Sequence, residues 1–333
     1  MGRISAVTRG YIFFAKEYYH NRKQTRHRVS REISKGEPDL SPILKNKKIR
    51  HRIEQYINFC QLLGQAVCAL YGRRMSVQEE MRFFYLSLLG PIFDDFFDKD
   101  NISPGTIKLM IRQPELHNPH SIAEDIFIQY LRRIYLSLKD PDPFRDVCLR
   151  LHDAQVESMR QSDPDLSANE IQCISMDKGG ISGTLYRHLL DEPLKDGEIG
   201  AIYQLGTLGQ FVDDIFDYYD DWEDGIRNTA NCLNNQTLLK MQFEQAVHET
   251  VNRFRHLDYH NENINEFLNL LNILISPAWI CLGQFDNLKF KYGERFSPEE
   301  AKRREMICDM ETWFNRLSLY FKSIYYYPLI MAN

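Results

Sequence analysis

The apolar positions of the chain recur every three to four residues over most of its length, which predicts helices rather than strands. No run of alternating β-branched residues bounded by turn residues is found. The fold class predicted is therefore all-α, a single large helical bundle around a central cavity. The predicted helices cover residues 53–72, 77–98, 121–139, 143–162, a segment that begins near Ala168, 196–223, 236–258, 262–276 and 298–325.

The helix at 77–98 is apolar over most of its circumference, in the stretch FFYLSLLGPIFDDFF. A helix of this kind belongs in the centre of a bundle. Ser76 and Glu79 have the spacing of a capping box, which predicts where this helix starts. The interval after it contains Pro104, Pro114 and Pro119 and is predicted to be rich in loops.

The composition is that of a globular protein, with 43% hydrophobic and 26% charged residues. It excludes collagen-like, disordered and disulfide-scaffold classes, because Gly, Pro and Cys are ordinary or sparse. The seven cysteines include no CxxC pair, and the first twenty residues lack the apolar core of a signal peptide. No apolar stretch is as long as the roughly 20 residues that a bilayer requires. A reduced, cytoplasmic protein is expected.

Charge is distributed unevenly along the chain. Residues 1–52 contain fourteen Lys and Arg and four Asp and Glu, a net charge of +10, whereas the whole chain carries −5. We expect residues 1–52 to form a basic N-terminal segment, either a peripheral helix or partly flexible, and residues 53–333 to form the helical domain. Such a segment is either a solvated face or attracts an anionic substrate or a membrane surface. No nucleic-acid-binding signature accompanies it, so no nucleic acid is expected.

Two segments place carboxylates among apolar residues. Asp94, Asp95 and Asp98 lie in the sequence FDDFFD, and Asp213, Asp214, Asp217 and Asp221 lie in FVDDIFDYYDD. On a helix, residues four apart share a face, and like charges stacked in this way destabilise the helix unless a cation binds between them. Carboxylates without Cys or paired His favour a hard cation, Mg²⁺ above all, and a ferritin-like di-iron site would need an ExxH pair. The alternative of exposed acidic patches at helix ends is disfavoured by the surrounding aromatic residues.

The order and spacing of these two motifs resemble the class I terpenoid synthase superfamily, which includes trans-isoprenyl diphosphate synthases, class I terpene cyclases and squalene and phytoene synthases. The resemblance covers roughly residues 55–325 and implies the isoprenoid synthase fold. It also implies that the two motifs face each other across a cavity and hold three Mg²⁺ ions that bind the diphosphate of an allylic prenyl substrate. Asp94, Asp95, Asp98, Asp213 and Asp217 are then catalytic, and Asp214 and Asp221 join them as metal ligands.

The resemblance also suggests cationic residues for the diphosphate. Lys178 resembles the lysine of a motif in prenyl synthases, although Gly179 replaces the usual Thr. Gly179, Gly180 and Gly183 are expected to break the helix there, as in the kinked helix of the family. Arg187 and Arg227 are further candidates for diphosphate binding, and Arg316, Lys322 and Tyr325–Tyr327 are candidates for a lid. Each of these is also interpretable as a surface residue.

The subclass stays open at this point. The Arg pair that usually follows the first motif in chain-elongating synthases is absent after Asp98, which favours a terpene synthase, a carbon–oxygen lyase that converts one prenyl diphosphate to a terpene. Chain elongation and head-to-head condensation are the alternatives. Homodimers are common in the superfamily, so a homodimer is an expectation of the same kind. A phosphohydrolase built on His152 and Asp153 and a non-catalytic helical scaffold are the other classes considered.

Overall fold

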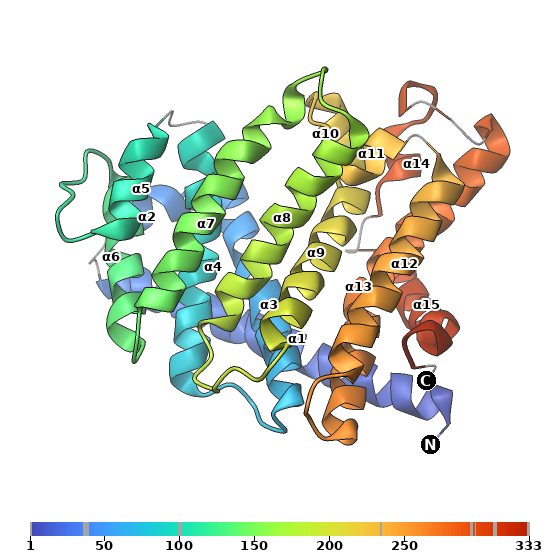
Figure 1. Ribbon diagram of the computed structural model, residues 1–333, viewed down its shortest axis with the longest axis horizontal. Helices are drawn as coiled ribbons and strands as arrows, with labels where there is room; N and C mark the ends of the chain where they lie inside the picture. Colours follow the sequence, from blue (N-terminus) through green and yellow to red (C-terminus); the bar gives the residue numbers. More distant parts are fainter. Residues whose placement is uncertain are drawn as a thin grey trace. The chain divides into compact units, whose positions relative to one another are not determined.

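The computed structural model describes residues 2–35, 40–98, 102–233, 235–293, 296, 298–308 and 312–331. All regular elements in these ranges are helices, which confirms the all-α class (Figure 1). They are α1 (Arg3–Lys35), α2 (Ser41–Leu44), α3 (Lys47–Leu70), α4 (Val77–Asp98), α5 (Pro104–Arg112), α6 (Ile122–Ser137), α7 (Asp142–Ser158), η1 (Met159–Ser162), α8 (Ala168–Arg187), α9 (Glu198–Phe216), α10 (Tyr218–Glu223), α11 (Thr229–Leu233), α12 (Gln236–Arg255), α13 (Asn261–Tyr292), η2 (Pro298–Glu300), α14 (Arg303–Met306) and α15 (Trp313–Met331).

The chain divides into two compact units. Unit 1 contains Met1–Ile12, Glu157–Thr184 and Leu194–Asn333, and unit 2 contains Phe13–Val156 and Leu185–Pro193. The first motif therefore belongs to unit 2 and the second to unit 1. The boundary predicted after residue 52 falls inside unit 2.

The core of unit 2 forms around α4, which packs against α3 and α6. Phe83, Phe84, Leu88 and Phe96 of α4 are almost completely buried, in agreement with the central position that its sequence predicts. The predicted capping box is confirmed: the Ser76 N–H donates to Glu79 at 2.7 Å, and the Glu79 N–H donates to the Ser76 hydroxyl at 3.2 Å. The helix therefore begins where the sequence predicts.

The core of unit 1 is built by α9, α12, α13 and α15. Trp279 of α13 is fully buried and stacks on Tyr326 of α15 with ring centroids 3.9 Å apart. Phe243 of α12 packs edge-on against Trp279 at 4.6 Å. Tyr326, predicted to belong to a lid, is thus part of the packing that joins α15 to α13.

Three predicted elements differ from the structure. The interval rich in prolines contains α5, because Pro104 occupies a first-turn position that needs no N–H donor. The helix predicted over 262–276 continues through Pro277 to Tyr292, since close packing of α13 in the core outweighs the backbone hydrogen bond that Pro277 cannot make. The helix predicted over 298–325 is instead η2, α14 and α15, with residues 309–311 outside the described ranges.

Among the described helices, α13 is the one long and apolar enough to cross a membrane by length and composition, and 72% of its most apolar window is buried within the protein. The sequence predicted that no apolar stretch is as long as a bilayer requires, and α13 reaches this mean hydropathy over a stretch that polar residues interrupt. Asn272, Ser276 and Pro277 interrupt the apolar sequence of α13, but the apolar residues around them keep its mean hydropathy high enough for a membrane span by composition. All seven cysteines are free thiols.

Candidate functional site

The first aspartate motif lies at the C-terminal end of α4. Asp94 and Asp95 have side chains that are about one quarter exposed, and both contact Arg52 of α3. The Arg52 guanidinium donates to Asp94 at 3.3 Å and to Asp95 at 3.4 Å. The side chain of Asp98 lies outside the described residues. A cation of the protein therefore contacts two of the predicted metal ligands.

Aromatic rings surround the backbone of this motif. Phe96 and Phe97 are buried, and Phe96 packs edge-on against Phe127 of α6 with centroids 5.3 Å apart. Phe93 stacks on Phe127 with ring centroids 6.2 Å apart. The rings fix the end of α4 in the core of unit 2, so the position of Asp94 and Asp95 is set by apolar packing.

The second motif spans a bend between two helices. The helix predicted over 196–223 is interrupted at Asp217, which lies between the end of α9 and the start of α10. The bend is local, because the Asp217 N–H donates to the Asp213 carbonyl and the Asp221 N–H donates to the Asp217 carbonyl, both at 2.8 Å. The helical spacing of these three aspartates is therefore kept across the interruption.

Carboxylates in this motif repel one another, although Arg303 donates to both oxygens of Asp220 at 2.7 and 2.6 Å. Asp217 is exposed to solvent, yet desolvation by the surrounding protein and repulsion from Asp213, Asp221 and Asp220 raise its pKa to about 7. Desolvation also raises the pKa of Asp221. Carboxylates that resist ionisation in this way gain free energy from a bound cation.

Asp214 is oriented differently from its neighbours. Its side chain is buried, and its two oxygens accept hydrogen bonds from the Gln210 amide and the Thr229 N–H, both at 2.9 Å. Desolvation raises the pKa of Asp214. These contacts connect α9 to the start of α11 and give no support to the prediction that Asp214 is a metal ligand.

Lys178 lies near the second motif, since its positive charge lowers the pKa of Asp221 and so opposes part of the rise. Its helix, α8, approaches α9 at three glycines. A Cβ atom built on Gly206 would lie 2.3 Å from the Gly179 carbonyl oxygen, and one on Gly183 would lie 2.9 Å from the Gly206 Cα. The prediction that Gly179, Gly180 and Gly183 break α8 was wrong, because all three lie in a continuous helix. Gly179 and Gly183 allow α8 to contact α9 backbone to backbone, and Gly180 faces the Tyr203 ring.

The two candidate arginines make contacts with backbone carbonyls. Arg187 is buried in unit 2 and donates to the carbonyls of Glu192 and Pro193 at 2.9 and 3.3 Å. Arg227 donates through one nitrogen to the carbonyls of Asp163, Pro164 and Leu166, at distances down to 2.6 Å. Both contacts stabilise chain turns, and the diphosphate-binding role of each stays a prediction.

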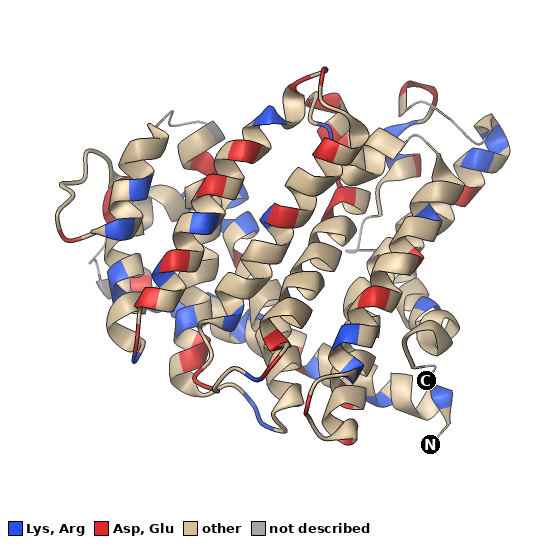
Figure 2. Cartoon of the chain, in the orientation of Figure 1, with Lys and Arg blue, Asp and Glu red and all other residues tan. Residues whose placement is uncertain are grey.

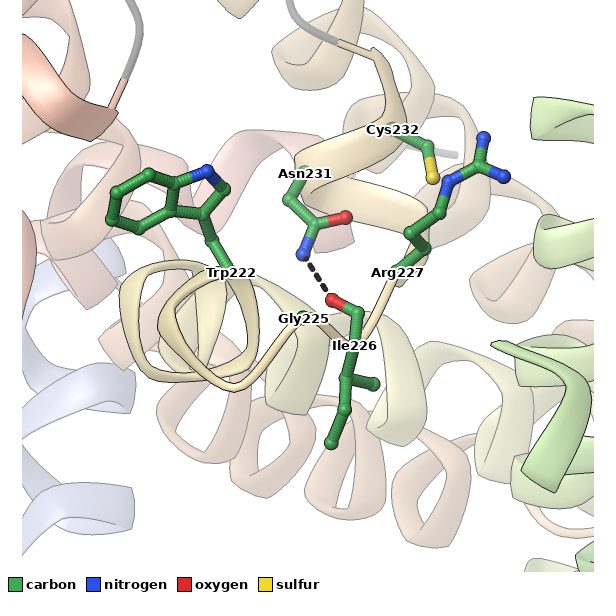
Figure 3. A pocket seen from close by; sticks show the side chains of 6 residues that line it. All are labelled: Trp222, Gly225, Ile226, Arg227, Asn231 and Cys232. Carbon is green, nitrogen blue, oxygen red and sulfur yellow. Dashed lines mark hydrogen bonds between the residues drawn. The ribbon is translucent and has the colours of Figure 1, made fainter. Parts of the chain in front are cut away.

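A pocket of about 460 Å³ lies just after the second motif (Figure 3). It is lined by Trp222, Gly225, Ile226, Arg227, Asn231 and Cys232, and the Asn231 amide donates to the Ile226 carbonyl at 2.9 Å across it. None of the predicted aspartates lines this pocket. Arg227, a candidate for diphosphate binding, is among its lining residues.

The alternative based on His152 and Asp153 finds no catalytic arrangement in the structure. His152 is buried and is held by the Pro104 carbonyl and by Asp153, both at 2.9 Å. Asp153 also accepts from Lys108 at 2.8 Å. These contacts connect α7 to α5.

Within the described ranges, no three His, Cys, Asp or Glu side chains converge closely enough to hold a metal ion. The first motif lies in unit 2 and the second in unit 1, and their meeting across a cavity stays a prediction of the resemblance. Searches of protein-family models, curated proteins and solved structures found no match to this chain.

Two residues near the motifs were missed in the sequence. Arg52 entered the sequence analysis only as one of the basic residues of the segment 1–52, and its contact with Asp94 depends on how α3 packs against α4. Asn228 is buried and donates to Asp221 at 2.8 Å. Asn228 and Asn231 exchange hydrogen bonds at the start of α11, each at 2.8 Å, so the spacing Asn-x-x-Asn was an available signal of a helix cap.

Proposed function

We propose that the protein is a Mg²⁺-dependent class I terpene synthase. It ionises an allylic prenyl diphosphate to a carbocation, releases diphosphate, and forms a cyclic or linear terpene hydrocarbon or alcohol. The observation that carries the proposal is the second motif, in which Asp213, Asp217 and Asp221 keep helical spacing while desolvation by the surrounding protein and mutual repulsion raise the pKa of Asp217 to about 7.

The donor set suits the metal. Asp213, Asp217 and Asp221 offer carboxylate oxygens alone, which are the ligands that Mg²⁺ prefers, and a bound cation would remove the repulsion that raises the pKa of Asp217. Mg²⁺ bound there would neutralise charge on the leaving diphosphate. Asn228 restrains Asp221 by its hydrogen bond, and Lys178 adds a positive charge that attracts the anionic substrate.

The first motif has a role of the same kind in this proposal. Asp94 and Asp95 are neutralised in part by Arg52, so a bound Mg²⁺ ion would compete with a protein cation for them. Arg52 would balance the charge of these carboxylates in the metal-free protein, and Mg²⁺ would balance it in the metal-bound protein.

The experiment is a product assay with purified protein, Mg²⁺ and prenyl diphosphates of increasing length, with and without isopentenyl diphosphate. A terpene hydrocarbon or alcohol formed from a single prenyl diphosphate, together with released diphosphate, is the expected result. A longer diphosphate that forms only with isopentenyl diphosphate would instead establish chain elongation, and two prenyl units joined without it would establish head-to-head condensation.

The matched variants are Asp217→Asn and Asp224→Asn. Both residues are exposed and lie seven positions apart, but Asp224 is outside the predicted ligand set. We expect Asp217→Asn to lower turnover by roughly a hundredfold or more and Asp224→Asn to leave it near the wild-type value. Equal activity of the two variants would show that the metal assignment is wrong.

A further inference from the structure

The outer face of α15 is apolar although it is exposed. Phe314, Leu317, Phe321 and Tyr325 are 74%, 43%, 58% and 69% exposed, and their spacing of three and four residues places them on one side of the helix. The opposite side packs on α13, where the Ser323 and Ser276 hydroxyls are 2.7 Å apart. This helix thus presents large apolar side chains to both the core and the solvent.

The start of α1 lies beside this face (Figure 1). The Thr8 hydroxyl is 2.9 Å from the Tyr320 hydroxyl, and the rings of Tyr11 and Tyr320 pack edge to face at 5.4 Å. Ile4 and Ile12 lie one turn before and one turn after Thr8, and they are 63% and 48% exposed. They extend the exposed apolar surface from α15 onto α1.

The charges on these two segments have one sign. Arg3, Arg9 and Arg316 are their basic residues outside the contact with α13, whereas the Lys322 amine lies against Gly283 of α13. Arg3–Ile12 and Trp313–Met331 contain no Asp or Glu (Figure 2). Exposed aromatic and aliphatic side chains beside basic ones, without carboxylates, fit the boundary between the headgroups and acyl chains of an anionic membrane.

We propose that this surface, formed by Arg3–Ile12 and α15 and here called the α1–α15 face, docks on anionic lipid bilayers. Phe314, Leu317, Phe321 and Tyr325 enter the interfacial layer, and Arg3, Arg9 and Arg316 contact lipid phosphates. The charge of the face also disfavours a second copy as its occupant, because two identical basic surfaces would repel each other. The proposal is independent of the chemistry assigned to the aspartate motifs.

The test is sedimentation of the full chain with vesicles of phosphatidylcholine alone and of phosphatidylcholine mixed with phosphatidylserine. We expect binding to the mixed vesicles, weakened by added salt, and much less binding to phosphatidylcholine. Each phenylalanine removed should weaken binding to the mixed vesicles by at least about tenfold, so the double variant Phe314→Ser/Phe321→Ser should bind about a hundredfold more weakly than the wild type. Both side chains are exposed, so the variant should keep the wild-type thermal unfolding curve.

The matched control is Leu136→Ser/Phe290→Ser, which removes two side chains that are 84% and 96% exposed on α6 and α13. It should bind like the wild type. No binding of the wild type to the mixed vesicles would overturn the proposal, and so would equal loss of binding in the two double variants. A different outcome would be a wild-type protein that is dimeric in solution, does not bind vesicles, and becomes monomeric in the Phe314→Ser/Phe321→Ser variant. This outcome would show that a second copy of the chain, and not a membrane, covers the α1–α15 face.

Discussion

Burial separates the acidic residues of this protein into groups with different chemistry. Glu79 is fully buried but compensated, since Arg73 donates to both of its oxygens at 2.8 Å. Asp214 is buried and hydrogen-bonded to α11. Asp217 is solvent-exposed, uncompensated and has a pKa near 7. Residue type is the same or similar in all three, so only the surroundings distinguish a structural carboxylate from a candidate ligand.

The pKa of Glu79 predicts acid sensitivity. Burial alone would raise this pKa, but hydrogen bonds from Arg73, the Asp191 N–H and the Ser76 N–H lower it to about 2. Its stabilisation is therefore present above the ordinary pKa of 4.5 and is lost as pH falls toward 2. We expect Glu79→Gln to lower the free energy of unfolding by about 2 to 3 kcal/mol at neutral pH and by much less near pH 3. Urea unfolding at several pH values measures this, and a constant difference across the range would contradict it.

At the residue scale, sequence spacing predicted the shared face of Asp213, Asp217 and Asp221 but not the inward orientation of Asp214. Adjacent residues on a helix point in directions about 100° apart, so one of the pair Asp213 and Asp214 had to leave the exposed face. Which one does so depends on Thr229, which follows a turn at Gly225 with φ near 73°. A contact of this kind between separate helices is not readable from local pattern.

At the scale of elements, the start of α4 was predictable because its signals are local. The capping box and the apolar run fixed it at Val77. The glycines of α8 misled the prediction, since low helix propensity was taken to break the helix. The close packing of α8 on α9 outweighs that propensity, and the missing side chains are what allow the packing.

The packing of α8 on α9 predicts a contrast between two glycines of one helix. A Cβ at Gly206 would meet the Gly179 carbonyl, whereas a Cβ at Gly209 has no atom within 4 Å. Gly206→Ala should destabilise the protein by about 2 to 3 kcal/mol, and Gly209→Ala should stabilise it by up to about 1 kcal/mol through helix propensity.

Urea unfolding of the two alanine variants measures this contrast. Similar unfolding midpoints for both would show that the backbones of α8 and α9 are further apart than described. A second consequence concerns the candidate site, because Gly206→Ala should also change the environment of Lys178, which neighbours Gly179, while Gly209→Ala should not.

At the scale of the whole molecule, the path of the chain was the least predictable feature. Unit 1 is assembled from three separate stretches and unit 2 from two, so neither corresponds to a continuous half of the sequence. Helix α1 contributes to both units and is continuous from Arg3 to Lys35. The net positive charge of residues 1–52 was evident from the sequence, but it contained no information about where the apolar side chains of this segment pack.

The first residues of α1 are predicted to stabilise unit 1. Val7 is fully buried, and the Asn269 amide donates to the Ala6 carbonyl at 3.0 Å. Deletion of residues 2–12 should lower the free energy of unfolding by roughly 3 kcal/mol or more. Thermal and urea unfolding of the truncated chain measure the change, with Arg9→Gln as a control that keeps the buried contacts. Unchanged stability of the truncated chain would contradict the described packing.

The glycine contact between α8 and α9 has an evolutionary consequence. A side chain at Gly179, Gly183 or Gly206 would clash with backbone atoms of the facing helix. A second substitution elsewhere cannot remove such a clash, because it changes a side chain and not the backbone. Related sequences should therefore keep small residues at these three positions, while larger residues are tolerated at position 209. In an alignment of orthologous sequences, small residues at positions 179, 183 and 206 would then indicate that the two helices make this close contact.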